Sequence, residues 1–341
     1  MKTMYGSQPA QLQFKSHRQP EDRPTAPGES DGIDRRDFLT CMAWAGTGLL
    51  WTMAGGIPSS KLFAATADNG GAEHSTRPGD FSFVQISDSH IGFNKAANQD
   101  VTGTLKLAID KINALPGSAD LMLHTGDITQ SSKPAEFDTA QQIINTAKVA
   151  RTFYVPGEHD TAMDDGALYH ERFGKGTLGR GWYSFTHKGV HFIGLNNSSQ
   201  IDGLGKLGRD QLDWLKADLA QLPASTPIIV FAHIPLWMVY PNWGWGTQDG
   251  EEALSYLKRF GSVTVLNGHI HQVAQKVEGS IAFHTAMSTA FPQPAPGTAA
   301  SAGPMIVPAA KLQTVLGITD IRFTARPSHL AVVDSSLADK A

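Results

Sequence analysis

The most restrictive feature of this sequence is a series of short apolar segments that each end at histidine or acidic residues. Five such ends occur, and their residues are Asp88 and His90, Asp127, Glu158 with His159 and Asp160, His233, and His269 with His271. Each apolar segment has the length and composition of a buried strand. The carboxyl ends of parallel strands meet at one edge of a sheet, where ligand sites form. The pattern therefore predicts an α/β fold with one site assembled from five strand ends.

The spacing of these residues indicates metal binding. Asp88 and His90 are two residues apart, as are His269 and His271, and residues at this spacing on a strand point to the same face. A lone histidine at a strand end is more often a structural residue, but five such ends in one chain indicate a shared metal site. Glycines that allow tight turns and a close backbone approach stand beside them, at Gly126, Gly157 and Gly268.

The segments between these ends alternate in character. Apolar spacing of three and four residues predicts helices over 101–115, 134–149 and 208–222. Strands are predicted over 81–86, 121–124, 152–155, 182–185, 190–195, 228–232 and 262–266, with mostly β structure in the last 70 or so residues. No repeat or linker divides this region, and the Pro- and Ala-rich stretch 291–308 is interpreted as a surface loop. Residues 68–341 are therefore predicted to form a single domain.

Residues 1–67 differ from the rest of the chain. Residues 1–34 are rich in Pro, Gly, Ser and Gln and are predicted to be disordered. The pair Arg35-Arg36, the apolar run 41–57 and the small residues 64–67 resemble a twin-arginine export signal. We therefore expect recognition by the twin-arginine export machinery, cleavage near Ala67, and a periplasmic or extracellular protein without a stable membrane anchor. The alternatives are a retained short membrane anchor, or an amphipathic helix after a charged linker.

Composition excludes several classes of protein. Charged residues make up 18% of the chain and hydrophobic residues 41%, which excludes a disordered chain, while 34 Gly and 19 Pro exclude a coiled coil. The single cysteine, Cys41, excludes a disulfide scaffold and a thiolate zinc site. The net charge of −4 gives no indication of a surface that binds nucleic acid.

The order of the motifs resembles the calcineurin-like metallophosphoesterase superfamily, whose pattern is D-x-H, G-D, G-N-H-D, H and G-H-x-H. Here the pattern stands as Asp88-Ser89-His90, Gly126-Asp127, Gly157-Glu158-His159-Asp160, His233 and Gly268-His269-Ile270-His271. The resemblance covers roughly residues 81–284. It implies a four-layered α/β/β/α sandwich with two mixed β-sheets, two metal ions at the strand ends, and hydrolysis of a small phosphate ester.

The resemblance also implies roles for individual residues. The first metal would be bound by Asp88, His90, Asp127 and His271. The second would be bound by Asp127, Glu158, His233 and His269, so that the Asp127 carboxylate bridges the two ions. His159 would not bind metal but would assist the leaving group, with Asp160 orienting its ring. A purely structural role beside the ligands is the alternative for His159.

These residue types suit Fe, Mn or Zn. Two ions about 3.5–4 Å apart clamp a phosphate and generate the nucleophile from water, so no side-chain nucleophile is needed. The predicted function is a dinuclear phosphodiesterase or phosphatase. The alternative is a catalytically silent metal-containing protein that binds a phosphorylated ligand.

Glu158 stands where the family pattern has Asn. A third carboxylate lowers the charge of a site with two divalent ions to about +1, and one ferric ion restores about +2. We therefore expect a mixed iron–divalent pair, unless Glu158 points away from the metals or the site is inactive.

Other features concern the branch of the superfamily and the surroundings of the site. The substrate-binding arginine of the Ser/Thr protein phosphatases is missing after Asp127, and residues 268–272 with 212–215 look more like the bacterial cyclic-nucleotide phosphodiesterases. The Trp-rich loop 235–246 either borders the site or is held by its own aromatic contacts. Packing or support is the expected role of three further histidines, His124, His191 and His284.

Overall fold

The computed structural model describes residues 50–54, 57–61, 79–325 and 328–339. The predicted disordered region, the arginine pair and the cleavage site near Ala67 lie outside these residues. Part of the apolar run forms strand β1 (Leu50–Ala54), which pairs antiparallel with β2 (Ile57–Lys61). Within the described part of the chain, no helix has the length and hydropathy needed to cross a membrane.

The first sheet of the body has five strands in the order β13-β12-β3-β4-β5. The strands β3 (Phe81–Ile86), β4 (Leu121–His124) and β5 (Arg151–Tyr154) run parallel, and β12 (Gly317–Ala325) and β13 (Ser328–Ser336) add antiparallel pairs. The parallel strands are connected through α2 (Val101–Ala114) and α3 (Pro134–Ile144). Helix α2 begins at Asp100, whose side chain accepts a hydrogen bond from the backbone N–H of Gly103 and so caps the first turn.

The second sheet has six strands in the order β10-β11-β9-β8-β7-β6. Its parallel centre is formed by β7 (Val190–Gly194), β8 (Ile228–Phe231), β9 (Val263–Asn267) and β11 (Ile281–Thr285), and its antiparallel edges by β6 (Tyr183–His187) and β10 (Gln275–Glu278). The predicted β6–β7 hairpin is present, and both of its turn residues, Lys188 and Gly189, have positive φ. Two helices belong to this half, α6 (Arg209–Ala220) and α7 (Gly250–Leu257).

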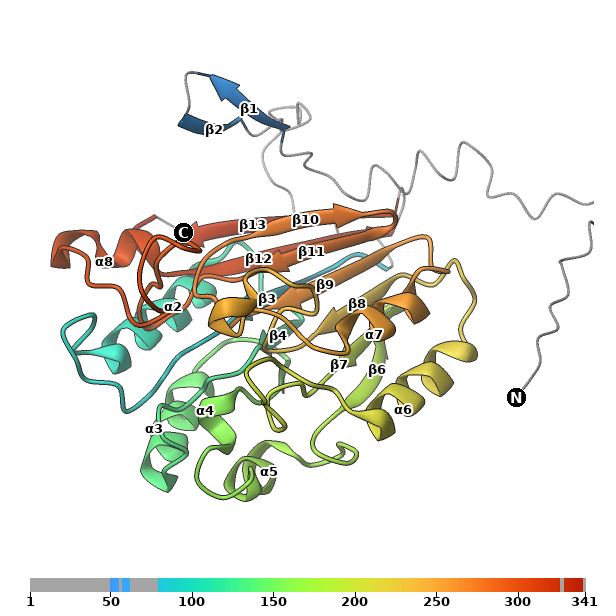
Figure 1. Cartoon of the computed structure of the whole chain (residues 1–341), viewed down its shortest axis with the longest axis horizontal. Helices are drawn as coiled ribbons and strands as arrows, with labels where there is room; N and C mark the ends of the chain where they lie inside the picture. The colour runs from blue at the N-terminus through green and yellow to red at the C-terminus, as the bar shows by residue number, and fades with distance from the viewer. Residues whose placement is uncertain (1–49, 55–56, 62–78, 326–327, 340–341) are drawn as a thin grey trace, which may run out of the picture. The chain divides into compact units, whose positions relative to one another are not determined.

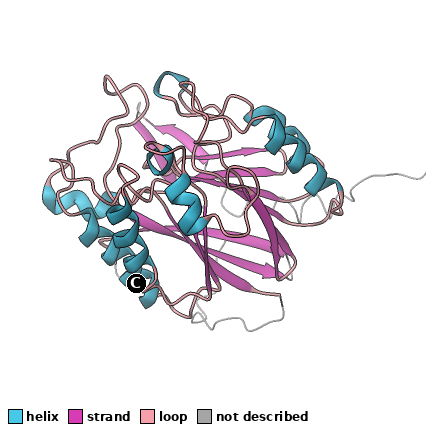
Figure 2. Ribbon diagram, turned by 90° about the horizontal axis from the view of Figure 1, so that it is seen from below, coloured by secondary structure: helices cyan, strands magenta, loops and turns pink. Residues whose placement is uncertain are grey.

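Three apolar clusters hold these layers together. Phe83 and Leu123 of one sheet pack with Phe192, Ile229 and Phe231 of the other to form the core between the sheets. A second cluster joins α2 and α3 to the outer face of the five-stranded sheet, and a third joins α6 and α7 to the six-stranded sheet. Figures 1 and 2 show the strands lying between helices on either side. The predicted α/β/β/α sandwich with two mixed sheets is confirmed.

Several boundaries differ from the prediction. Helix α3 ends at Ile144 rather than near residue 149, because the next turn tightens through bonds from the N–H groups of Thr146 and Ala147 to carbonyls three residues earlier. The short elements α4 (Glu158–Thr161), α5 (Ala167–Phe173), η1 (Pro241–Trp243) and α8 (Ala309–Val315) were not predicted, and neither was α7. The first four are too short to display a clear apolar period, whereas α7 does bury Ala253, Leu254 and Leu257 at helical spacing and was missed.

Candidate metal centre

The loops that follow β3 and β4 are joined by backbone hydrogen bonds. The N–H of Asp88 donates to the carbonyl of Gly126 over 3.0 Å, and the N–H of His90 donates to the carbonyl of Asp127 over 2.9 Å. These bonds continue the parallel pairing of the two strands past their ends. They bring Asp88, His90 and Asp127 together on one side of the sheet edge.

Five of the seven predicted metal ligands have a left-handed backbone. Their φ values are 54° for Asp88, 42° for His90, 51° for Asp127, 70° for His269 and 52° for His271. These residues lie beyond the ends of the strands. The alternation of side chains along a strand therefore does not bring the residues two apart to the same side, contrary to the prediction from their spacing. A non-glycine residue in this region costs about 1–3 kcal/mol, and such strain gathers at functional sites.

Two glycines are required by close approach rather than by a turn. A Cβ atom on Gly157 would overlap the Oδ1 atom and backbone N of Asp127, and one on Gly268 would overlap the Oγ atom of Ser87 and crowd the carboxylate of Asp88. Any larger residue at either position would displace a carboxylate from the site.

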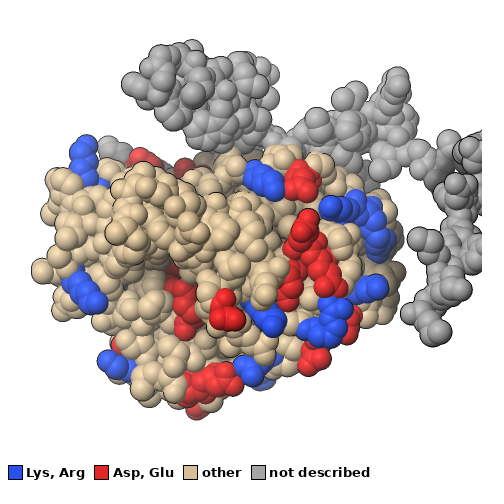
Figure 3. Space-filling model, viewed as in Figure 1, with Lys and Arg blue, Asp and Glu red and all other residues tan. Residues whose placement is uncertain are grey.

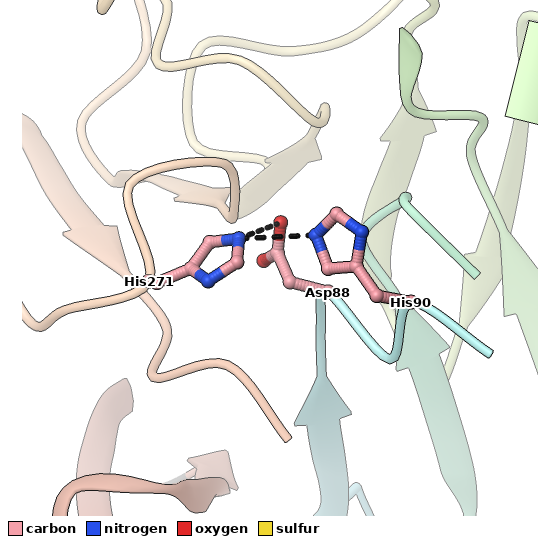
Figure 4. A group of neighbouring side chains, drawn as sticks. All are labelled: Asp88, His90 and His271. Atoms are coloured by element: carbon pink, nitrogen blue, oxygen red, sulfur yellow. Dashed lines mark hydrogen bonds and ion pairs between the residues drawn. The ribbon is translucent and has the colours of Figure 1, made fainter. Parts of the chain in front are cut away.

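The first group of side chains consists of Asp88, His90 and His271 (Figure 4). The Nε2 atom of His271 lies 3.3 Å from Asp88 Oδ1 and 3.2 Å from His90 Nε2. The Nδ1 atom of His271 donates to the carbonyl of Phe291 over 2.6 Å, so the Nε2 atom carries the free lone pair of the neutral ring. Three metal-binding atoms thus face one point.

The second group consists of Glu158, His233 and His269. The carboxylate of Glu158 lies 2.9 Å from His233 Nε2 and 3.0 Å from His269 Nδ1, and these two nitrogens are 3.3 Å apart. The Nδ1 atom of His233 donates to the carbonyl of Thr125 over 2.7 Å, which directs Nε2 into the site. Glu158 therefore points toward this group, not away from it.

Asp127 lies between the two groups. Its Oδ2 atom is 3.5 Å from His90 Nε2 in the first group and 3.4 Å from His233 Nε2 in the second. This is the arrangement that a bridging carboxylate requires. The structure thus brings together all seven residues predicted to bind metal, in the two groups that the resemblance implies.

The electrostatics of this cluster fit cations. Three buried or half-buried carboxylates, of Asp88, Asp127 and Glu158, lie 2.9–3.5 Å from ring nitrogens of the histidines. Burial lowers the pKa of His90 to about 3, so this ring is neutral. Burial also opposes protonation of His233, but the carboxylates of Asp127 and Glu158 outweigh it and raise the pKa of His233 well above its usual range. The cluster therefore demands positive charge, which bound metal ions would supply.

His159 lies beside the cluster without joining either group of three described above. Its ring packs edge-on against His90, with centroids 4.8 Å apart, and its backbone N–H donates to Asp127 Oδ1 over 3.0 Å. The Nδ1 atom lies 2.7 Å from the carbonyl of Gln130 and donates to it, so Nε2 is the free ring atom. Burial lowers the pKa of His159, but the carboxylates of Asp127 and Glu158 act more strongly, and the net pKa is raised.

The expected role of Asp160 is wrong. Its carboxylate accepts hydrogen bonds from the backbone N–H groups of Gly157, Ile128 and Thr129 at 2.9–3.1 Å, and from the Thr129 hydroxyl. Asp160 therefore joins the loop after β4 to the loop after β5, and the carbonyl of Gln130 orients His159 instead. Burial raises the pKa of Asp160 to about 7, even though these donors favour the charged form.

The three additional histidines have supporting contacts. His124 lies below the site, with Nε2 2.9 Å from the Ser89 hydroxyl. His191 pairs with Asp218 at 2.8 Å, and His284 pairs with Asp334 at 2.9 Å. These contacts agree with the predicted packing and support roles.

The Trp-rich loop is held by its own aromatic contacts. Trp243 packs edge-on against Tyr240 and against the buried Trp245, each at 5.1 Å, and Trp237 packs on Phe283 at 4.9 Å. Of the two readings of this loop, the contacts favour internal stabilisation for its tryptophans.

Comparisons with known proteins agree with this geometry. The family model described as calcineurin-like phosphoesterase matches residues 81–273. The chain belongs to this family. It is 29% identical over 218 residues to a 3',5'-cyclic-nucleotide phosphodiesterase from Nostoc sp., covering 62% of this chain and 79% of that protein. As a member of this family, the chain is a metal-dependent hydrolase of phosphate esters.

Solved structures show the same fold. A dimetal phosphatase from Danio rerio superposes with a TM-score of 0.55 at 14% identity, covering 76% of this chain and 97% of that one. A purple acid phosphatase from yellow lupin (Lupinus luteus) superposes with a TM-score of 0.56 at 15% identity, covering 78% and 53% of the two chains.

Replacing Asp127 with Asn should lower the occupancy of both metal positions, because this carboxylate lies between the two groups. His271→Ala should mainly empty the first position. Elemental analysis of the purified variants measures both effects, and Asp218→Asn, which alters contacts with His191 and Ser184 rather than with a predicted ligand, serves as the control. Two tightly bound ions in Asp127→Asn would contradict the bridge.

Proposed function

We propose that this protein hydrolyses small phosphodiesters at a dinuclear metal centre. The observation that carries the proposal is the Asp127 carboxylate between two groups of three ligands, each with its free atoms facing one point. Two ions bound there would polarise a phosphoryl group and acidify water. The diester preference is supported by the cyclic-nucleotide phosphodiesterase to which the chain is similar.

Residues of the chain would compensate charge, orient the ligand rings and donate a proton to the leaving group. Asp88, Asp127 and Glu158 would compensate cationic charge at the site, and the carbonyls of Thr125 and Phe291 fix the rings of His233 and His271. Water that has released one proton to the solvent attacks phosphorus through its oxygen as the bond to the leaving oxygen breaks. His159 gives its Nε2 proton to that leaving oxygen, since its Nδ1 proton is held by the carbonyl of Gln130.

The test of this proposal uses bis-(p-nitrophenyl) phosphate and the protein loaded with Mn²⁺. Turnover that stops on metal removal and returns on reloading supports the hydrolase. Stoichiometric metal and tight phosphate binding without turnover would favour the silent binding protein instead.

Replacing His159 with Ala should keep the metal content and lower the rate by about 10²–10⁴-fold, the usual effect of losing a positioned general acid. The loss should shrink for diesters with good leaving groups, which need no proton. A series of aryl diesters with different leaving-group pKa values measures this dependence. Equal losses across the series would exclude the proton transfer.

We also propose that the native centre contains iron, as a ferric–divalent pair. Support comes from the inward orientation of the Glu158 carboxylate, 2.9 Å and 3.0 Å from two ring nitrogens, which adds a third negative ligand. A hard, charged oxygen ligand favours a harder or more highly charged ion.

Glu158→Asn should therefore shift the preference toward two divalent ions such as Mn²⁺, because the ligand set loses one negative charge. Metal analysis and electron paramagnetic resonance of the native protein and the variant measure this shift. Glu158→Gln removes the negative charge but keeps the length of the side chain. It therefore distinguishes the effect of the lost charge from the effect of the shorter Asn side chain. Stoichiometric zinc without iron in the native protein would refute the charge argument.

We further propose that the chain is exported through the twin-arginine route. The support is the sequence of residues 35–67. Replacing Arg35 and Arg36 together with Lys should leave the full-length protein in the cytoplasm, because the signal requires both arginines. Cell fractionation and N-terminal sequencing of the exported form measure this, with Arg18→Lys and Arg23→Lys as the control. Unchanged export of the Arg35, Arg36 double variant would contradict the proposal.

A further inference from the structure

Two loops beside the candidate metal centre lack charged residues. They comprise residues 235–248 and 291–308, here called the uncharged loops, and neither contains Lys, Arg, Asp or Glu. Charged residues make up 18% of the whole chain, and most of residues 295–308 are exposed, so burial does not explain their absence. Figure 3 shows uncharged surface on the part of the molecule where Figure 1 places the chain leading to α8.

The loop 291–308 begins in direct contact with the metal centre. The Phe291 carbonyl accepts the hydrogen bond from His271, and the Phe291 ring lies 4.8 Å from the ring of His90 and 4.7 Å from that of His271. The side chain of Gln272 donates to the carbonyl of Pro294 over 3.1 Å. This loop therefore borders the first group of ligands.

The farther end of this loop returns toward the same point. The N–H of Met305 donates to the carbonyl of Pro292 over 2.8 Å. This bond returns the chain just before Ile306 to the start of the loop, beside Phe291. Ile306 itself is 68% exposed.

The loop 235–248 meets the first loop and starts two residues after His233. A Cβ atom on Gly297 would lie 3.5 Å from the Tyr240 hydroxyl, so the two loops are neighbours there. Met238 of this loop is 47% exposed. The two uncharged loops thus meet at Gly297 and Tyr240, and each begins beside the centre, one just after His233 and the other against His271.

The segment that follows His159 has the opposite character. Asp164 and Asp165 are the third and fourth residues after the end of α4, and Asp165 pairs with Arg180 at 2.8 Å. The segment after α4 therefore carries charged residues, whereas the uncharged loops carry none.

We propose that the uncharged loops bind the organic group of the phosphodiester, and that they select a neutral group with aromatic or aliphatic surface. This inference rests on the proposed function and specifies its substrate class. A neutral ring or chain gains free energy when it leaves water against Ile306, Met238 and Tyr240. An additional ionised group, such as a second phosphate or a carboxylate, loses hydration there and finds no counter-charge on either loop.

The test compares two diesters that share one leaving group, p-nitrophenolate. The first is p-nitrophenyl phenyl phosphate, and the second is p-nitrophenyl 4-carboxyphenyl phosphate, which adds a single carboxylate. The metal-loaded enzyme should prefer the phenyl ester by roughly tenfold in kcat/KM, because the carboxylate is desolvated without a partner.

Charge variants then locate the organic group. Ile306→Lys should lower the ratio of kcat/KM for the phenyl ester to that for the carboxyphenyl ester by roughly two- to fivefold, the range of an exposed ion pair. Ile306→Glu should raise this ratio. Met238→Lys is a second site on the other loop and should act in the same direction as Ile306→Lys. Val333→Lys, at an exposed apolar residue of the edge strand β13, is the matched control and should leave the preference unchanged.

The outcomes are distinguishable. Equal rates for the two esters would overturn the substrate class while the proposed function stands. A preference that neither lysine variant alters, or that Val333→Lys alters equally, would overturn the assignment to the uncharged loops. Absence of turnover with both esters, at full metal content, would overturn the proposed function itself.

Discussion

The rest of this structure depends on the convergence of carboxylates and imidazoles at the adjoining ends of the two sheets. Asp88, Asp127 and Glu158 follow strands of the five-stranded sheet, whereas His233 and His269 follow strands of the six-stranded sheet. Facing lone pairs and carboxylates repel each other unless positive charge lies between them. Metal ions would therefore hold together the ends of the two sheets, and their binding free energy would add to the stability of the sheet packing.

Backbone hydrogen bonds around the centre keep these mutually repelling side chains close together. Left-handed conformations at five ligands would relax in an isolated loop, but here each loop is tied to its neighbour. The bonds of Asp88 and His90 to the loop after β4, and those of Asp160 to the same loop from α4, connect three strand ends. The rings of His233 and His271 are oriented by carbonyls of Thr125 and Phe291. These bonds orient the rings and loops that carry the predicted ligands.

The sequence predicted the two sheets and that these acidic and histidine side chains gather at the strand ends, because apolar strands and their end residues are encoded in side chains. It did not predict what orients His159, since the group responsible is the backbone carbonyl of Gln130, which any residue could supply. Asp160 was misassigned for the same reason: its partners are backbone N–H groups of residues 128, 129 and 157. The two-residue spacing of ligands indicated the right pairs through the wrong geometry, because positive φ in Asp and His leaves no mark in the sequence.

Glu158 and the uncharged loops act in the same direction on the proposed substrate. On the proposed ligand set, the third carboxylate lowers the positive charge of the centre, and the side chain of Glu158 is 28% exposed, so an approaching anion meets it directly. The uncharged loops add no cation to compensate. A phosphate monoester carries nearly two negative charges at neutral pH, since its second pKa is about 6, whereas a diester carries one. With two divalent ions bound, each additional charge on the substrate would meet weaker attraction here than at a centre with a neutral amide ligand, whereas the proposed ferric ion would restore the charge of that centre. With the ferric–divalent pair, the uncharged loops alone would discriminate, and they favour a neutral organic group over a charged one.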